Sequence, residues 1–229
     1  MITAPPPTLG RASLLAGVAA LTRLDRRLGA LVQRHGPPPL WARPRGFPTL
    51  LRIILEQQVS LVSAAALYRR LAAALPHIAP EPILTLGVTG LQALGFTRQK
   101  ASYVCGLAAD VGGGALALRH LPRWPDREVS ERLIRIRGIG PWTASIYLLM
   151  ALRRPDVWPP GDLALHQALA RLEGTPGLPS SSQAERLAER WRPLRAVAAR
   201  ILWHAYLCDR SPRARVRRAR ESAVVQTMG

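Results

Sequence analysis

The chain of 229 residues has few cysteines, a single lysine and no long apolar run. Its two cysteines, Cys105 and Cys208, are far apart, which argues against a disulfide framework and indicates a reducing compartment. No apolar stretch approaches the roughly 20 residues that a membrane-spanning helix needs. The apolar segment 12–21 is followed at once by charged residues without a small-residue cleavage site. Val18, Leu21, Leu28 and Leu31 continue a helical stripe through those charges, so the sequence predicts one core helix, not a signal peptide. We therefore expect a cytoplasmic protein with no membrane partner.

Metal-ligating patterns are also scarce. His204 and Cys208 lie four residues apart, on one face of a predicted helix, but they supply only two ligands. The other histidines form no recognisable pair. The sequence therefore predicts neither a zinc site nor a cofactor.

Positive charge, by contrast, is abundant. The net charge is +18, and nearly all of the cationic side chains are arginine. A GC-rich coding bias would explain why arginine replaces lysine, but not the excess over 14 acidic groups. A basic balance of this size favours a polyanionic partner, most simply nucleic acid.

One stretch predicts a helix, a tight turn and a second helix. An amphipathic run ends at Arg137, Gly138-Ile139-Gly140 follows, and Pro141 can open a helix because it needs no N–H there. Small glycines at a helix N-terminus let a phosphate approach the main-chain N–H groups. Taken alone, the stretch is more typical of an ordinary connection between two antiparallel helices.

Asp162 follows a Pro-Pro-Gly turn and precedes a helical pattern that extends to Leu172. This position predicts an N-cap, whose carboxylate is held ionised by the helix N–H groups and dipole. A carboxylate facing a cationic transition state has the same requirement. By itself, a capping aspartate is usually only a cap.

Together, the glycine turn and the aspartate one helix later resemble the helix-hairpin-helix DNA glycosylase superfamily. The stretch GIGPWTASIYLLMALRRPDVWPPGD is similar to its DNA-3-methyladenine glycosylase II branch. Trp142 stands where the bifunctional members carry their Schiff-base lysine, and Lys100 is the only lysine of the chain. Because an imine mechanism needs an amine, the resemblance implies a monofunctional enzyme. Two cysteines are too few for the iron-sulfur subgroup.

The resemblance runs from about Leu24 to Tyr206 and implies an all-α fold. We expect about ten helices in two lobes, with an active-site cleft between the lobes, lined by the hairpin, Asp162 and Trp203. The expected form is compact and monomeric, without the β-rich N-terminal domain of larger members. The predicted organisation is a flexible lead-in (1–10), a glycosylase domain (11–208) with the hairpin at about 131–152, and a basic tail (209–229).

The helix predicted from residue 50 to about residue 75 carries Gln57 and Gln58 in an otherwise apolar run. Buried amides are costly unless they are paired, so these side chains satisfy backbone groups at a lobe interface, line a pocket, or form a solvent-facing strip. The resemblance favours the pocket, because this helix lies beside the lesion site in the family.

The loop 95–100 is expected to enter the gap that a flipped nucleotide leaves. The family carries an apolar wedge at the position that Arg98 occupies here. This departure leaves two alternatives open: Arg98 fills the gap itself, or Arg98 holds a phosphate while Phe96 acts as the wedge.

The implied activity is excision of alkylated purines, such as 3-methyladenine and 7-methylguanine, from double-stranded DNA in base excision repair. Asp162 would assist hydrolysis of the glycosidic bond, and Trp142, Trp203 and Tyr147 would hold the base. A core position is the alternative for Trp203. The residues expected to bind DNA are Gly138, Ile139, Gly140, Thr143, Arg98, Phe96 and Lys100. A structural monovalent cation is expected at the carbonyls of Ile136 and Ile139, and the protein is expected at the bacterial nucleoid.

Two other functions fit parts of the sequence. A catalytically silent DNA-binding module would explain the hairpin and the charge, but not Asp162 and the pocket aromatics. A monofunctional glycosylase for an oxidised or deaminated base would use the same parts on another substrate. The family's aromatic at the position of Ile146 is missing here, so the substrate range stays open.

Overall fold

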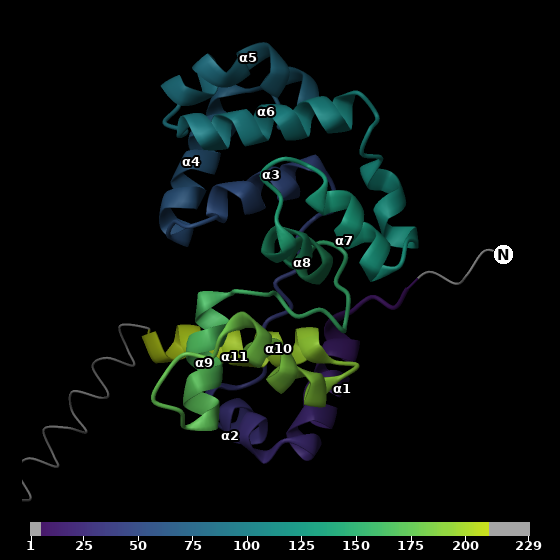
Figure 1. Ribbon diagram of the computed structural model, residues 1–229, viewed down its shortest axis with the longest axis vertical. Helices are drawn as coiled ribbons and strands as arrows, with labels where there is room; N and C mark the ends of the chain where they lie inside the picture. Colours follow the sequence, from purple (N-terminus) through teal and green to yellow (C-terminus); the bar gives the residue numbers. More distant parts are fainter. Residues whose placement is uncertain (1–5, 211–229) are drawn as a thin grey trace, which may run out of the picture. The chain divides into compact units, whose positions relative to one another are not determined.

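The computed structural model describes residues 6–210, and these residues form α-helices and two 3₁₀ helices without any β-strand (Figure 1). The expected all-α fold class is therefore confirmed. Residues 1–5 of the predicted lead-in and residues 211–229 of the predicted basic tail lie outside the described part. From residue 6 to residue 210, no helix combines the length and hydrophobicity needed to cross a membrane.

The described chain divides into two compact units. The first unit holds residues 6–8 and 41–154, and the second holds 9–40 and 155–210. The chain returns to the first unit at Trp41, inside the proline-rich stretch 36–48. The helices of the first unit are α3 (Phe47–Glu56), α4 (Leu61–Ala74), α5 (Pro80–Ala93), α6 (Arg98–Gly112), η1 (Leu118–Arg123), α7 (Asp126–Ile134) and α8 (Pro141–Met150). Those of the second unit are α1 (Arg11–Leu24), α2 (Arg26–His35), α9 (Leu163–Glu173), α10 (Ser181–Ala188), η2 (Glu189–Trp191) and α11 (Arg195–Arg210).

The core of the first unit is built on α3 and α8, which pack against each other. Every residue of α8 from Thr143 to Leu149 is buried, as expected for a helix that is apolar all round. Helix α3 buries Phe47 and every aliphatic residue from Leu50 to Leu55, and it also packs on α4 and α6. Helix α7 packs on α8, so the turn that joins them is fixed to this core.

Two helices predicted to be continuous are broken. The helix expected from residue 50 to about 75 ends at Glu56, because Gln57 is extended (φ −62°, ψ 126°) and Gln58 has a left-handed φ of 55°. The apolar stripe expected to run through one N-terminal helix is divided at Asp25, which has φ −130° and ψ 104°. Its carboxylate accepts the N–H of Arg27 at 3.0 Å and thereby caps α2. In both cases a local cap replaces helical continuity.

The core of the second unit is built on α11, which packs on α1, α2 and α9. Residues 196–203 of α11 are all buried. Arg200, fully buried, donates to the carbonyls of Leu40 at 3.0 Å and Ala196 at 2.9 Å. Burial lowers the pKa of its guanidinium to about 10.

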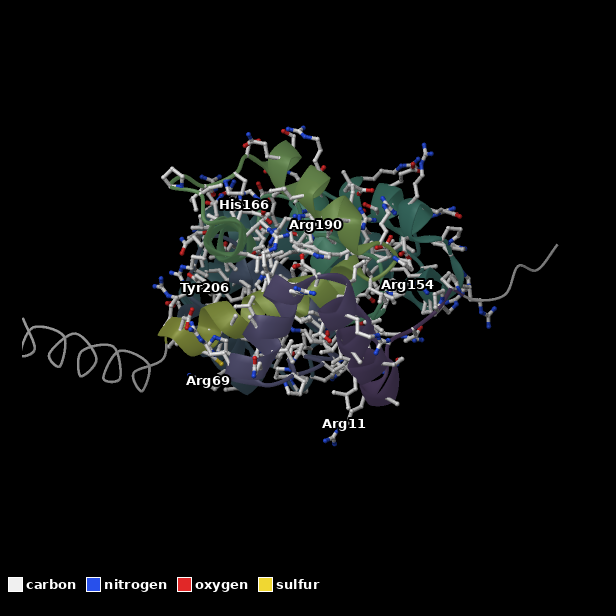
Figure 2. The ribbon with its side chains drawn as sticks, turned by 90° about the horizontal axis from the view of Figure 1, so that it is seen from below. Arg11, Arg69, Arg154, His166, Arg190 and Tyr206 are labelled. Atoms are coloured by element: carbon white, nitrogen blue, oxygen red, sulfur yellow. The ribbon has the colours of Figure 1, made fainter. Side chains whose placement is uncertain are left out.

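A second buried arginine, Arg154, joins separate segments of the first unit. Its guanidinium donates to the carbonyls of Pro6, Pro122 and Trp124 and pairs with Asp126 at 2.9 Å. In Figure 2, by contrast, the Arg11 side chain extends away from the ribbon. Leu9, in the second unit, is also buried. Residues Pro6 and Leu9, within the predicted lead-in, are thus held by the folded chain.

Candidate functional site

Asp162 is the N-cap of α9, as its position after the Pro-Pro-Gly turn predicted. Its Oδ1 accepts the backbone N–H of Leu165 at 2.9 Å. Gly161, just before it, has a φ of 70°, a conformation that favours glycine and lets the chain turn sharply into the helix. The carboxylate therefore has a fixed position at the positive end of a helix dipole.

Trp203 on α11 contacts the same carboxylate oxygen. Its indole N–H donates to Oδ1 of Asp162 at 3.1 Å, and only 8% of the residue is exposed. The sequence placed Trp203 beside the base or in the core, but gave no sign of this hydrogen bond. Two donors on one oxygen fix the orientation of the Asp162 side chain.

The predicted hairpin is the turn between α7 and α8. The Ile139 N–H donates to the Ile136 carbonyl at 3.0 Å, and Gly138 has a φ of 90°. A Cβ at Gly138 would lie 2.3 Å from Cγ of Tyr103, so both backbone and space require glycine here. Gly140 is the N-cap of α8 and Pro141 is its exposed first residue. The turn thus presents a helix N-terminus.

Gln57 fastens this turn to the end of α3. Its amide nitrogen donates to the Gly138 carbonyl at 2.9 Å and to the Thr143 hydroxyl at 2.8 Å. Thr143 is only 2% exposed. The sequence suggested a pocket role for Gln57 and DNA contact for Thr143, whereas the structure pairs the two side chains with each other. Their hydrogen bonds hold the hairpin in shape.

Lys100, on α6, holds the end of α3 from which Gln57 reaches the hairpin. Its ammonium donates to the carbonyls of Leu55 at 2.7 Å and Gln57 at 3.0 Å, where α3 ends. A cation is favourable at a helix C-terminus because it compensates the carbonyl groups left unpaired there. Burial lowers the pKa of the Lys100 amine below its usual value. The lysine expected to touch DNA is therefore engaged within the protein.

Gln58 lies at the exposed tip of the turn between α3 and α4. Three apolar neighbours are also exposed: Val59 by 45%, Leu61 by 61% and Val62 by 78%. A glutamine at positive φ beside unburied apolar side chains is unusual, and such sites are often functional. The apolar pattern predicts a continuous helix here, so this turn is a departure from the expectation.

The two candidate wedge residues, Phe96 and Arg98, differ in exposure. Arg98 is exposed at the first position of α6, whereas Phe96 is 4% exposed. A wedge must reach between stacked bases, so burial of Phe96 argues against that role for its ring.

The remaining pocket candidates differ in burial. Trp142, in the first turn of α8, is half-buried. Tyr147 is fully buried, its hydroxyl accepts the Gly46 N–H at 3.0 Å, and burial raises its pKa. Tyr147 therefore braces the chain ahead of α3 instead of lining a surface pocket.

Candidate metal sites are few. Within residues 6–210, no group of three or more His, Cys, Asp or Glu side chains could hold a metal ion. The Ile136 carbonyl, expected to bind a monovalent cation, accepts the Ile139 N–H, and both side chains are buried. A carbonyl has a second lone pair, so this turn is compatible with a cation, which stays a prediction.

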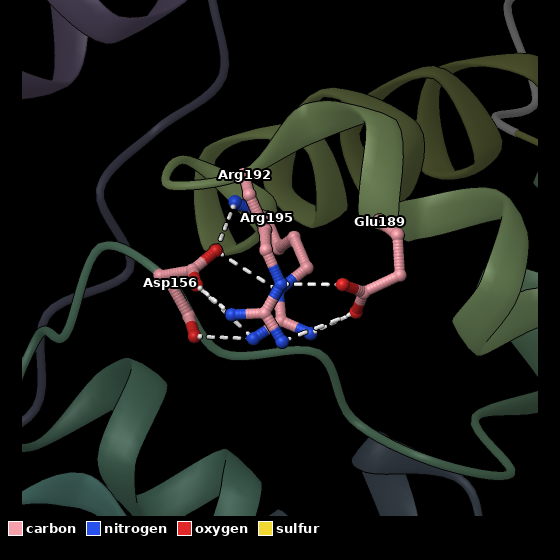
Figure 3. A network of polar contacts seen from close by, with 4 residues as sticks. All are labelled: Asp156, Glu189, Arg192 and Arg195. Carbon is pink, nitrogen blue, oxygen red and sulfur yellow. Dashed lines mark hydrogen bonds and ion pairs between the residues drawn. The ribbon is translucent and has the colours of Figure 1, made fainter.

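A group of ion pairs that the sequence does not predict joins the segment before Asp162 to residues 189–195. Asp156 contacts Arg192 and Arg195, and Glu189 contacts the same two arginines (Figure 3). No local sequence pattern predicts these contacts, because Asp156 and Arg195 are 39 residues apart in the chain.

Comparison with protein families gives a match over most of the chain. Residues 51–193 match the model described as HhH-GPD superfamily base excision DNA repair protein. This range includes the hairpin, Gln57, Lys100 and Asp162.

Individual relatives carry related names. The Bacillus subtilis protein YfjP, named among the DNA-3-methyladenine glycosylases, is 29% identical over 78% of this chain and 65% of its own length. DNA-3-methyladenine glycosylase 1 of Schizosaccharomyces pombe is 28% identical over 83% of this chain and 87% of its own. The solved structure of the S. pombe 3-methyladenine DNA glycosylase Mag1, in complex with abasic DNA, superposes with a TM-score of 0.76 at 25% identity. It covers 86% of this chain and 98% of that one. The present chain thus spans about two thirds of the first relative and most of the other two.

Proposed function

Because the chain belongs to the HhH-GPD superfamily of base excision DNA repair proteins, we propose that it is a monofunctional DNA N-glycosylase. Its substrates are alkylated purines of the 3-methyladenine and 7-methylguanine type in double-stranded DNA. The names of its relatives support this substrate class. The observation that carries the proposal is Asp162, an oriented carboxylate with two donors on one oxygen.

One carboxylate is sufficient for this reaction. A purine alkylated at N3 or N7 is already cationic, so it can leave without a general acid. Once the nucleotide is flipped out of the duplex, Asp162 stabilises the positive charge that develops on the sugar and aligns or deprotonates the attacking water. Trp142 and Trp203 hold the electron-poor base by stacking and cation-π attraction.

The hairpin grips the phosphate backbone. Its glycines leave the N-terminus of α8 accessible, and the N–H groups there attract an anion. Exposed Arg135 and Arg137 flank the turn and add positive charge. Gln57 and Lys100 keep the turn in the shape that this contact needs.

The turn at Gln58 fills the gap left by the flipped nucleotide. Its exposed tip and the apolar side chains of Val59, Leu61 and Val62 suit insertion between bases. Arg98, exposed at the start of α6, then contacts a phosphate. This assignment replaces the buried Phe96 as the wedge.

Absence of lyase activity is part of the proposal. Trp142 stands at the lysine position of the bifunctional enzymes, and the Lys100 amine already donates to two carbonyls. Borohydride should therefore trap no covalent protein-DNA adduct, and strands should stay intact until alkali is added. Efficient trapping would contradict the monofunctional assignment.

We also place the protein at the bacterial nucleoid as a monomer. A net charge of +18 supports steady association with DNA. Sedimentation of the purified protein, alone and with a short duplex, tests the monomeric state.

The decisive experiment measures release of free methylpurines from methylated duplex DNA by the wild type and by Asp162→Asn. Asparagine still caps α9, so the stability should change by less than about 1 kcal/mol. The rate should fall about a hundredfold or more, because the negative charge beside the sugar is lost. A wild-type rate in the folded variant would refute the role of Asp162.

The same assay separates the alternatives. Wild-type protein that binds duplexes but releases no alkylated, oxidised or deaminated base would be a silent DNA-binding module. Release of only oxidised or deaminated bases would indicate the other glycosylase class.

A further inference from the structure

The segment from Pro155 to Asp162, here called the Asp162 loop, has no helix or strand of its own. Pro159 and Pro160 restrict its backbone, and Val157 and Trp158 are each 6% exposed. Trp158 packs against Trp191 with 6.0 Å between ring centroids. The loop is therefore a packed structure whose shape depends on contacts with other elements of the second unit.

Helix α11 holds the start of this loop. The Ala196 N–H donates to the Pro155 carbonyl at 3.0 Å. Oδ1 of Asp156 accepts the backbone N–H of Arg195 at 3.2 Å and its Nε at 2.9 Å, and Oδ2 accepts Nη2 at 3.1 Å. The Asp156 carbonyl accepts the same Nη2 at 3.2 Å. Arg195 thus grips both the side chain and the backbone of one loop residue, as Figure 3 shows for the side chains.

The same helix holds the end of the loop, through the hydrogen bond from Trp203 to Asp162. Eight residues separate Arg195 from Trp203, which corresponds to about 12 Å along the helix axis. One rigid element therefore fixes both ends of the segment that carries the carboxylate.

The four ion-paired residues differ in exposure, and their ion pairs therefore differ in how firmly they hold the loop. The side chains of Asp156 and Arg195 are 21% and 15% exposed, and they form a two-pronged guanidinium-carboxylate pair. Glu189 and Arg192 are 49% and 52% exposed, and pairs at such positions contribute little. Glu189 contacts the two arginines without contacting the loop. Among the ion pairs of this cluster, the one between Arg195 and Asp156 is therefore the main contact that holds the loop.

We propose that Arg195 and Asp156 are positioning residues, which set the place of Asp162 for the reaction through the Asp162 loop. The inference rests on the proposed glycosylase function. Reactivity falls steeply when a catalytic group is misplaced, by roughly a hundredfold for a displacement of 1 Å. Loosening the loop start should therefore reduce the chemical step without reducing DNA affinity.

The test uses Asp156→Asn, which replaces one carboxylate oxygen with an NH₂ group facing the guanidinium donors. We expect a single-turnover excision rate at saturating DNA that is about tenfold lower or more, with a dissociation constant within about twofold of wild type. Arg195→Lys should behave similarly, because an ammonium does not reproduce the guanidinium fork. The matched control, Glu189→Gln, should excise at the wild-type rate. A wild-type rate in folded Asp156→Asn would overturn the proposal.

A double-mutant cycle separates positioning from general stability. If Asp156 acts only through Asp162, adding Asp156→Asn to Asp162→Asn should leave the residual rate unchanged. A full further loss in the double variant would overturn the proposal, as would equal losses in Asp156→Asn and Glu189→Gln.

A readout that does not need catalysis distinguishes failure of this inference from failure of the proposed function. The indole N–H resonance of Trp203 reports its hydrogen bond to Asp162. It should shift in Asp156→Asn and stay in place in Glu189→Gln. An unmoved resonance in both variants would show that the loop start does not position Asp162, whatever reaction the protein catalyses.

Discussion

Trp203 and Trp158 are two buried tryptophans of the second unit whose indole N–H groups have different surroundings. That of Trp203 donates to Asp162, whereas that of Trp158 is buried without a hydrogen-bond partner in the described part of the chain. Phenylalanine keeps an apolar ring but has no N–H. Loss of a hydrogen bond to a charged group costs roughly 1.5 kcal/mol or more, about tenfold in rate. We therefore expect Trp203→Phe to lower single-turnover excision about tenfold.

Trp158→Phe is the control for lost ring volume, and it should excise within about twofold of wild type. Thermal melting of both variants shows whether they are folded at the assay temperature. Equal rate losses in the two would mean that ring packing, and not the hydrogen bond to Asp162, explains the effect.

Asp25 makes stability depend on pH. Burial opposes its ionisation, but hydrogen bonds from Arg27 and Trp191 outweigh burial, so its pKa lies below the usual 3.8. A carboxyl whose pKa is lower in the folded state contributes stability above the pKa of the unfolded chain, and loses it as pH falls through the folded value. Asp25→Asn should therefore lower the free energy of unfolding at pH 7 by about 1–3 kcal/mol.

The difference between Asp25→Asn and wild type should shrink as the pH falls below about 3.9, where the unfolded carboxyl takes up its proton. Urea unfolding of both proteins between pH 7 and pH 2.5 measures this. A difference that stays constant over that range would show that the loss comes from packing and not from charge.

At the scale of elements, the two glycines of the hairpin differ in backbone conformation and in the space around them. Gly138 combines a φ of 90° with a neighbouring tyrosine ring, whereas a Cβ at Gly140 would meet nothing within 4 Å. Gly138→Ala should therefore destabilise the protein by about 2 kcal/mol, and Gly140→Ala should leave stability within about 0.5 kcal/mol.

Duplex affinity tests the role of Gly140 separately from stability. If a phosphate approaches the backbone at the start of α8, Gly140→Ala should weaken duplex affinity in a fully stable protein. Fluorescence anisotropy with a short duplex, beside urea unfolding, separates the two effects. Wild-type affinity in Gly140→Ala would place the phosphate elsewhere.

Local signals predicted some elements well. Asp162 was recognised as an N-cap and the glycine turn as a connection between helices, since both depend on residues within a few positions. The break at Gln57 was missed, because the residues that stabilise it belong to α6 and to the hairpin. Lys100 and Gly138 lie more than 40 positions away, and no periodicity reveals such contacts.

The same reason explains what was missed around Asp162. Its position as an N-cap can be predicted from neighbouring residues, but its hydrogen bond to Trp203 joins residues 41 positions apart in the chain. The family resemblance implied DNA contacts for Thr143 and Lys100, and only the folded chain shows their internal partners.

At the scale of the whole molecule, the dominant feature is the net charge of +18. Binding of a duplex should release counterions, so the logarithm of affinity should fall linearly with the logarithm of salt concentration, with a slope of about 0.9 per phosphate neutralised. Titrations between roughly 50 and 200 mM salt measure this slope. An affinity that does not respond to salt would contradict a nucleic-acid partner.

The division of the chain also sets an order of events during synthesis. Helices α1 and α2 are synthesised before α11, on which both pack and which begins about 160 residues after the end of α2. At ordinary rates of translation that interval is roughly 10–30 s. Residues 41–154, which form nearly all of the first unit, are complete before then. The nascent chain therefore contains all of residues 41–154 before the second unit can be completed, and the faces of α1 and α2 that pack on α11 stay uncovered until α11 is made.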